Sequence, residues 1–181
     1  MKKPLLVYLL LLGYLGTAQS TASNGLEDLG RINLGLHGLE LSYEFPLSKQ
    51  FVWENNLGIG MGMEAFAGSP TFTFYLYRPT PFIKSQLKWI YNRNKRERKG
   101  KNSQYNAGNY IGLQGKYSFG DSDLFDISQA VLTEIHWGIQ RSIGGRFTFN
   151  LHLGMGVVTD FDFSDNAFSP TFGLRFGYRI F

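Results

Sequence analysis

Apolar and polar residues alternate with a period of two along most of this chain. In the last segment every second position is apolar: Phe172, Leu174, Phe176, Tyr178 and Ile180. Successive side chains of a β-strand point to opposite faces, so this pattern predicts a strand with one apolar face and one small or polar face. The same period recurs in six further segments, at residues 39–45, 51–65, 83–91, 111–119, 131–139 and 147–157.

Strand length and composition favour a barrel that crosses a membrane. Most segments run to ten or more residues, which fits the roughly 9–11 that a tilted strand needs to cross a bilayer. Aromatic residues make up 16% of the chain and glycines number 22, which suits a lipid-facing surface with aromatic girdles. The sequence therefore predicts an all-β fold, an antiparallel transmembrane β-barrel. A soluble β-sandwich or lipocalin-like barrel is the alternative.

A single-chain barrel of this kind has an even number of strands, so the seven segments call for an eighth. Two stretches qualify: residues 30–36, where Ile32 and Leu34 are apolar, and residues 72–76. The pattern does not choose between them. The apolar phase changes at His37 and Gly38, which predicts either a bulge in one long strand or a turn between two strands.

The first 20 residues have the features of a cleaved secretory signal peptide. Lys2 and Lys3 precede an apolar stretch at residues 5–15, which is followed by mostly small residues. The stretch is shorter than the roughly 20 residues of a spanning helix, so we expect cleavage, after Ala18 or else after Ser20 or Ala22. Residues 1–20 are therefore assigned to the signal peptide and residues 21–181 to the barrel domain. The chain has no cysteine, which excludes disulfides.

The two faces of the strands predict two environments. The apolar phase should face lipid, and it includes Leu57, Ile59, Met61, Phe149, Leu151, Phe172, Phe176 and Tyr178. The opposite phase should face the lumen and form an ion-pair network among Glu40, Glu44, Glu54, Glu64, Lys84, Lys88, Lys116, Glu134, Arg175 and Arg179. Eight strands enclose only enough room for their own side chains, and buried charges must be paired, so a closed lumen is expected.

Loop charges divide by position along the chain. Residues 93–101 are strongly basic, whereas the loops at 120–129 and 159–169 are acidic. Strand alternation puts the two acidic loops on one side and the basic turn on the other. The basic turn is interpreted as solvated or in contact with anionic head groups, rather than as a nucleic-acid site. Residues 160–165 resemble the start of a calcium loop but lack its glycine and final glutamate, so no metal site is predicted.

On these features the chain resembles the small eight-stranded outer-membrane barrels of the OmpA/OmpX type, and most of all the uncharacterised barrel proteins of that kind in Gram-negative bacteria. The resemblance rests on the signal peptide and on residues 41–49, 89–93, Arg96, Gly100, Lys101, 108–110 and Phe181. It implies a location in the cell outer membrane and contact with outer-membrane lipid. It also implies insertion by the barrel assembly machinery, with Phe181 in the assembly signal.

In that family the last strand ends in the periplasm, which would place the acidic loops outside the cell. The family's apolar residues also keep phase with the last aromatic. Here Phe181 stands out of phase with Tyr178 and Ile180, which predicts a slip in the strand before the terminal residue.

The sequence contains no catalytic constellation, so we expect a monomer without enzymatic activity or cofactor. Its role would be structural, adhesive or one of contact with an external ligand of unknown identity. A lipid-modifying enzyme that uses His136 or His152, which point inward near Glu134, is one alternative. No Gly-x-Ser-x-Gly motif supports it, and polar lumen histidines are the favoured interpretation. A soluble periplasmic barrel that binds an apolar ligand is the other alternative.

Overall fold

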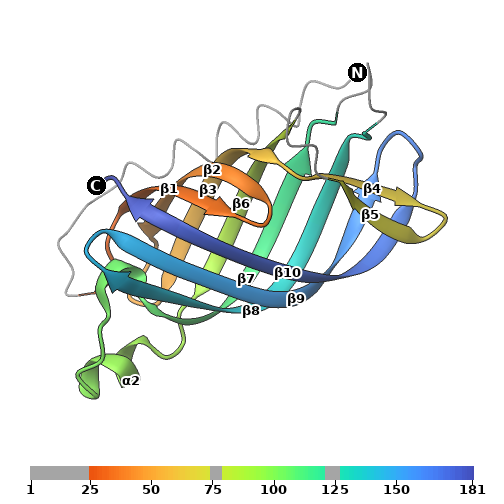
Figure 1. The fold of residues 1–181 in the computed structure, drawn as a ribbon. Helices are drawn as coiled ribbons and strands as arrows, with labels where there is room; N and C mark the ends of the chain where they lie inside the picture. Colours follow the sequence, from red (N-terminus) through yellow and green to blue (C-terminus); the bar gives the residue numbers. More distant parts are fainter. Residues whose placement is uncertain (1–24, 74–78, 121–126) are drawn as a thin grey trace.

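The chain folds into a closed antiparallel barrel of eight strands, seen in a computed structural model (Figure 1). The structure describes residues 25–73, 79–120 and 127–181, so the predicted signal peptide and the 121–126 part of one acidic loop lie outside the described residues. The barrel strands are β1 (Leu29–Gly35), β2 (Gly38–Pro46), β3 (Phe51–Gly60), β6 (Thr80–Trp89), β7 (Gly108–Ser118), β8 (Ala130–Gly144), β9 (Phe147–Asp160) and β10 (Asn166–Arg179). Each strand pairs with its neighbour in the chain, and β1 pairs with β10 to close the ring.

Three short elements lie outside this ring. A two-stranded hairpin, β4 (Gly62–Phe66) and β5 (Ser69–Thr73), stands between β3 and β6. A helix, α2 (Arg93–Arg98), and a single 3-10 turn, η2 (Gln104–Asn106), lie between β6 and β7. Within the described part of the chain, no helix is long and apolar enough to cross a membrane.

The eighth strand is β1, the first of the two candidate segments. Leu36 and His37 form a tight turn between β1 and β2, in which Gly35 pairs with Gly38. Gly38 has a φ of 120°, which a residue with a side chain adopts only with strain. The change of apolar phase at His37 therefore marks a turn between two strands rather than a bulge in one.

The predicted strand over residues 51–65 ends early, at Gly60. A Cβ on Gly60 would lie 1.8 Å from the carbonyl oxygen of His37, so glycine is needed where β3 passes this turn. The chain then bends inward, and Met63 and Ala65 of β4 become fully buried. They pack on inward-facing residues of the long strands β8, β9 and β10: Ala130, Leu132, Val158 and Ala167.

Polar side chains face the lumen and apolar ones face outward. On β8, for example, Glu134 and His136 are buried, whereas Ile135 and Trp137 are largely exposed. Leu57 on β3 and Leu113 on β7 are about as exposed as Ile135, at 60% and 57%. The two faces therefore divide as the two-residue period predicts, and the barrel is apolar outside and polar inside.

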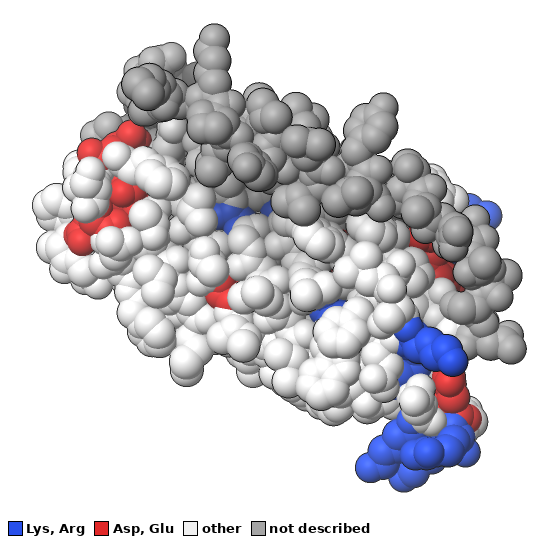
Figure 2. All heavy atoms as spheres, turned by 180° about the vertical axis from the view of Figure 1, so that it is seen from behind, with Lys and Arg blue, Asp and Glu red and all other residues white. Residues whose placement is uncertain are grey.

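The two ends of the barrel differ in charge. We call the end with the 47–50, 90–107 and 145–146 connections the basic end, because it carries α2. The other end, with the β1–β2 turn, the β4–β5 hairpin and the 161–165 turn, is the acidic end. Figure 2 shows a cluster of Lys and Arg atoms at one end and acidic atoms near the other.

The wall is lower on one side of the acidic end, because the strands differ in length. β10 pairs with β9 from Asn166 to Tyr178 but with β1 only from Arg175 to Arg179. One further hydrogen bond, from Leu36 N to Leu174 O at 3.0 Å, completes that seam. Past it, residues 166–173 have no strand partner on this edge among the described residues. We call this gap between β10 and the β1–β2 turn the notch.

The chain ends on the outer face of the barrel. Ile180 N donates to Gly30 O at 2.8 Å, and Gly30 N donates to Phe181 O at 3.2 Å. Ile180 and Phe181 thus both pair with Gly30, so two residues of one strand lie opposite one residue of the other, as in a β-bulge. Phe181 packs over Gly30, with its ring 6.2 Å from that of the outward-facing Tyr43. The slip predicted before the terminal residue is therefore present.

Candidate functional site

The candidate site is the lumen, where charged side chains from five strands meet. At its centre the amine of Lys88 contacts two carboxylates, Glu54 at 2.5 Å and Glu44. Arg31 binds the same two acids, with its Nη2 2.9 Å from Glu44 and 3.3 Å from Glu54. All four side chains are at most 3% exposed. Two cations thus neutralise two carboxylates in a space from which water is excluded.

Arg175 extends this group toward the acidic end. Its guanidinium lies 2.7 Å from Glu54 and 2.6 Å from Glu40, and Lys84 lies 2.6 Å from the other oxygen of Glu40. The pairs therefore form one continuous network across the lumen. We call it the lumen network; it consists of Arg31, Glu40, Glu44, Glu54, Lys84, Lys88 and Arg175.

A loop closes the basic end of the lumen. Asn106 of η2 donates to Glu44 at 2.6 Å and to the carbonyl of Glu27, and Gln140 donates to the carbonyl of Tyr105 at 2.8 Å. Tyr105 and Asn106 adopt positive φ values of 56° and 55°, a conformation that non-glycine residues hold only where their surroundings fix it. The hydrogen bonds to the lumen network supply that constraint, so η2 acts as a plug.

A second cluster, Glu134, His136 and His152, lies on β8 and β9. Glu134 Oε1 is 2.9 Å from His136 Nδ1 and 3.5 Å from His152 Nε2, and the two imidazoles stack with centroids 4.3 Å apart. The other ring nitrogen of His136 lies 2.6 Å from the side-chain nitrogen of Gln86. Each nitrogen of His136 therefore has a polar neighbour, although Nδ1 forms no well-aligned hydrogen bond.

The two imidazoles occupy space left by glycines on neighbouring strands. A Cβ on Gly112 would lie 2.4 Å from His136 Nε2, and one on Gly173 would lie 2.1 Å from the ring of His152. Each histidine pairs directly with that glycine in the sheet register. The glycines thus allow the two rings to lie flat against the wall.

The same three side chains offer ligand atoms within 4.8 Å of one another, a donor set of the type that holds zinc. However, Lys84 and Arg175 line the same small cavity as His152, so the cluster lies beside two positive charges. These charges would repel a divalent cation. We therefore assign no metal to this cluster.

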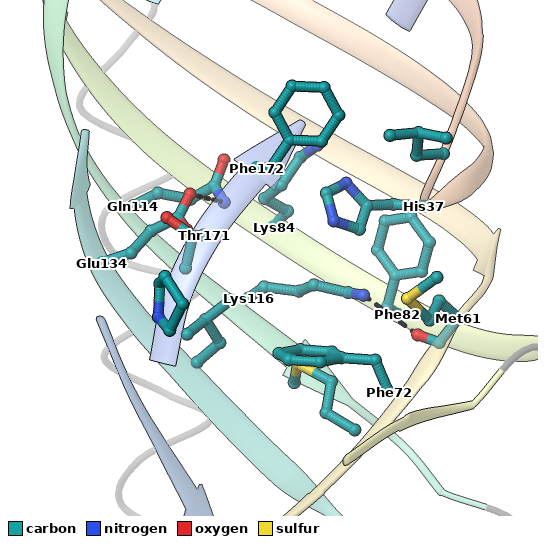
Figure 3. A pocket seen from close by; sticks show the side chains of 14 residues that line it. His37, Met61, Phe72, Phe82, Lys84, Gln114, Lys116, Glu134, Thr171 and Phe172 are labelled. Atoms are coloured by element: carbon teal, nitrogen blue, oxygen red, sulfur yellow. Dashed lines mark hydrogen bonds between the residues drawn. The ribbon is translucent and has the colours of Figure 1, made fainter. Parts of the chain in front are cut away.

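A cavity of about 320 Å³ lies at the acidic end, beyond the lumen network (Figure 3). Its polar lining includes His37, Lys84, Gln114, Lys116 and Glu134. Apolar side chains complete it: Leu36, Met61, Met63, Phe72, Phe82, Leu132, Pro170 and Phe172. The cavity thus combines an apolar wall with two lysine amines and one carboxylate.

The pKa of His37 reflects the surroundings of this cavity. His37 lies in the β1–β2 turn, where burial and the positive charges of Lys116 and Lys84 together lower the pKa of its imidazole to about 4, while the carboxylates of Glu40 and Glu134 act in the opposite direction. The imidazole is therefore neutral near pH 7. The two lysines that line the cavity with His37 would attract an anion there.

Two residues expected in the lumen network lie elsewhere. Glu64 is on β4, in the hairpin outside the barrel ring, because β3 ends at Gly60. Arg179 lies at the basic end, where its guanidinium packs 4.8 Å from the ring of Tyr105 and 3.9 Å from Glu27. Lys116 and Glu134 do face the lumen, but among the described residues neither lies within 4 Å of an oppositely charged group of the lumen network.

Most residues expected on the lipid face point outward. Leu57, Ile59, Phe172, Phe176 and Tyr178 are between 42% and 60% exposed, and Phe149 and Leu151 are half-buried on the outer face of β9. Met61 is half-buried and lines the cavity at the acidic end. It lies outside β3, which ends at Gly60, so it does not continue the outward face of that strand.

Sequence reasoning missed Arg31 and Asn106. Arg31 alternates with Ile32 on β1, so it would have been placed inward had residues 30–36 been chosen as the eighth strand. Asn106 lies in a loop without periodicity, and no local signal marks it. Comparisons of the chain with protein-family models, with curated proteins and with solved structures found no match.

Proposed function

We propose that the protein is an integral β-barrel of the bacterial outer membrane, with a closed lumen and a structural, adhesive or ligand-contact role. The observation that carries this proposal is the outward apolar surface. Exposed large apolar side chains occur on every barrel strand, and they outnumber the large apolar side chains that are buried. Soluble monomers rarely expose apolar patches larger than a few hundred Å². In a lipid environment these apolar side chains would not be exposed to water, so the unfavourable free energy of that exposure would be absent.

Aromatic groups near both ends of the barrel support the proposal. Toward the basic end, Trp89 stacks on Phe51 and packs at a tilt against Tyr91, and Trp137 Nε1 donates to Tyr91 Oη at 2.9 Å. Toward the acidic end, Tyr117 packs against Phe119 and Phe161. Aromatic side chains with a polar group prefer the boundary between lipid and water. The two groups would therefore lie at the two membrane surfaces.

The interior argues against a soluble barrel that carries its ligand in the centre. Such a barrel would need an apolar lumen and a polar outer surface, which is the reverse of the distribution seen here. The lumen network and the η2 plug fill the middle and the basic end, so the proposed role involves no open pore. The remaining open region is the cavity at the acidic end.

The proposed role is not catalytic. The two nitrogens of His136 lie beside Glu134 and Gln86, and within the described residues no hydroxyl group donates to either His136 or His152. A hydrolase or acyltransferase would need a nucleophile in contact with its base. The positions and the partners of these two histidines instead suit a structural role, in which they pack against the inner wall of the barrel.

Orientation and partners complete the proposal. Phe181 would belong to the signal read by the barrel assembly machinery, and the acidic end would face outward from the cell. The 161–165 turn and the β4–β5 hairpin would then be the surfaces available for adhesion or for an external ligand. The barrel would act as a monomer surrounded by lipid.

Membrane extraction tests the location. The full chain, expressed in a Gram-negative cell, should stay with the membranes through washes in concentrated urea and in alkaline carbonate. It should also migrate differently on a gel before and after heating. A variant that lacks residues 1–20 is the matched control, and it should not reach the outer membrane. Release of the intact chain into the urea wash would contradict the proposal and favour a soluble barrel.

A further inference from the structure

The cavity at the acidic end opens toward the outer apolar face of the barrel. Leu36 and Phe172 line the cavity and are also 48% and 46% exposed, and they stand on opposite sides of the notch. Phe72 of the β4–β5 hairpin lines it as well and is 38% exposed. The cavity is thus continuous with the apolar exterior, because the wall is missing a strand partner along residues 166–173.

One charged group in this cavity differs from the others in the lumen. Every cation of the lumen network lies within 4 Å of a carboxylate. Across residues 25–73, 79–120 and 127–181, no carboxylate lies that close to the amine of Lys116. The amine instead donates to the carbonyl oxygen of Met61 at 3.0 Å and lies 4.6 Å from the centroid of Phe82, as Figure 3 shows.

Burial makes this position costly without an anion. Lys116 is 3% exposed, and a buried ammonium is tolerated when it is paired and hydrogen-bonded. Lys84 lies on the same wall, 6.0 Å from the centroid of Phe82, but its charge is already met by Glu40. Glu134 also lines the cavity, and its carboxylate accepts from Gln114 at 2.7 Å and contacts His136. Lys116 is therefore the group that an incoming anion would meet.

We propose that this cavity binds a carboxylate with a medium-length alkyl chain, with the carboxylate on Lys116 and the chain against the aromatic and aliphatic wall. The volume of about 320 Å³ is at the lower end of the range for small-ligand pockets, which excludes a whole phospholipid. An apolar wall that opens onto an apolar surface favours an amphiphile over a small hydrophilic anion. The buried amine of Lys116, which has no carboxylate within 4 Å among the described residues, favours an acid over an alcohol of the same length.

Dodecanoate and dodecanol are the probes, because they share a chain and differ in charge. Each is titrated against the folded full chain in an uncharged detergent, and bound copies are counted by native mass spectrometry. Wild-type protein should bind a single dodecanoate about tenfold more tightly than dodecanol, the gain expected of one charge-assisted hydrogen bond. Equal affinity for the two probes would overturn the proposal.

Substitutions locate the site. Lys116→Met should weaken dodecanoate about tenfold and leave dodecanol nearly unchanged, while Lys116→Arg should keep the preference for the acid. Leu132→Trp should fill the cavity and weaken both probes. Lys95→Met at the basic end is the matched control and should change neither. Tight dodecanoate binding that survives both Lys116→Met and Leu132→Trp would place the ligand elsewhere and overturn the proposal.

The outcomes remain interpretable when a variant does not fold. If Lys116→Met fails to fold, the wild-type preference for dodecanoate and the weaker binding of both probes to Leu132→Trp decide the question. The test is also independent of the proposed membrane location. A barrel released by urea would contradict that location but would still bind dodecanoate if the cavity acts as proposed.

Discussion

Arg175 on β10 and Glu54 on β3 meet across the lumen, with Nη2 of the arginine 2.7 Å from Oε1 of the glutamate. The two strands are not neighbours in the barrel; β1 and β2 lie between them. The pair therefore ties opposite parts of the wall together through the interior. Glu54 is completely buried, so its charge depends on Arg175, Lys88 and Arg31 for compensation.

Removal of Arg175 should destabilise the barrel. Loss of one partner from a buried ion pair costs about 3–5 kcal/mol, because it leaves an uncompensated charge. Arg175→Ala should accordingly lower the free energy of unfolding by about 3 kcal/mol, at the low end since Lys84 still contacts Glu40. Urea unfolding in lipid vesicles, followed by the heat-dependent gel shift, measures this change. Arg98→Ala, at an exposed position of α2, should have little effect, and equal effects of the two changes would contradict a paired lumen.

Charged substitutions on the outer face should cost more near the middle of the barrel than at its rim. Leu113 lies midway along β7, whereas Ile59 lies one residue before the end of β3. Arginine near the bilayer midplane costs about 2–4 kcal/mol and about 0–1 kcal/mol near the interfaces. Leu113→Arg should therefore lower stability in vesicles more than Ile59→Arg does. Equal costs, or none at either position, would argue that this surface does not contact lipid.

Most of the fold could be predicted from the alternation of apolar and polar residues, because a two-residue period indicates which side chains share a face of a strand. It placed Glu40, Glu44 and Glu54 inward, since their apolar neighbours alternate with them on β2 and β3. It did not reveal which charges would meet, because Arg175 reaches Glu54 through the lumen rather than along the sheet. Such contacts depend on the diameter and the register of the closed barrel.

The prediction failed where tertiary packing overrides the local pattern. The apolar phase continues from Ile59 through Met61 to Met63, so periodicity alone extends the strand. The chain bends instead, since Gly60 passes within contact of His37 and Met63 gains full burial inside the mouth of the barrel. The alternation of apolar and polar residues cannot predict that the β4–β5 hairpin folds over the acidic end of the barrel.

Asp165 should tie the β4–β5 hairpin to the β9–β10 turn in a pH-dependent way. Hydrogen bonds from the backbone amides of Gly68, Asn166 and Ala67 hold the pKa of its exposed carboxyl below the usual 3.8. A depressed pKa means that the stabilisation is present above about pH 4 and is lost as the pH falls through the lower, folded-state value. The amide proton shift of Gly68, measured by NMR in micelles, should change over that acidic range.

The Asp165→Asn variant should show the released Gly68 shift already at neutral pH, because the neutral amide is a weaker acceptor. Asp162→Asn is the matched control: Asp162 accepts from Gln129 and not from the hairpin. A Gly68 shift that follows pH equally in wild type and in Asp165→Asn would show that another group is responsible.

The unmodified protein should form no stable large channel in planar lipid bilayers. The lumen network occupies the centre and Asn106 of η2 contacts Glu44 at the basic end, so no continuous water path is expected. Current recordings at both polarities, with the purified full chain, measure this. Steady porin-like conductance would contradict a closed lumen.

Labelling of single cysteines should reveal which end of the barrel faces outward. Ser164 lies in the acidic turn between β9 and β10, and Ser103 lies in the connection after α2 at the basic end. The two positions are therefore at opposite ends of the barrel, and in a membrane they would lie on opposite sides whichever way the barrel inserts. The chain has no natural cysteine, so each label reports one site.

An impermeant maleimide should modify Ser164→Cys on intact cells and should modify Ser103→Cys only after the outer membrane is opened. This result is expected because the acidic end is proposed to face outward and the basic end to face the anionic groups and solvent of the periplasm. The reverse labelling pattern would invert the orientation while leaving the barrel intact. Labelling of both positions on intact cells would instead show that the two ends are not separated by a membrane, and it would contradict the proposed location itself.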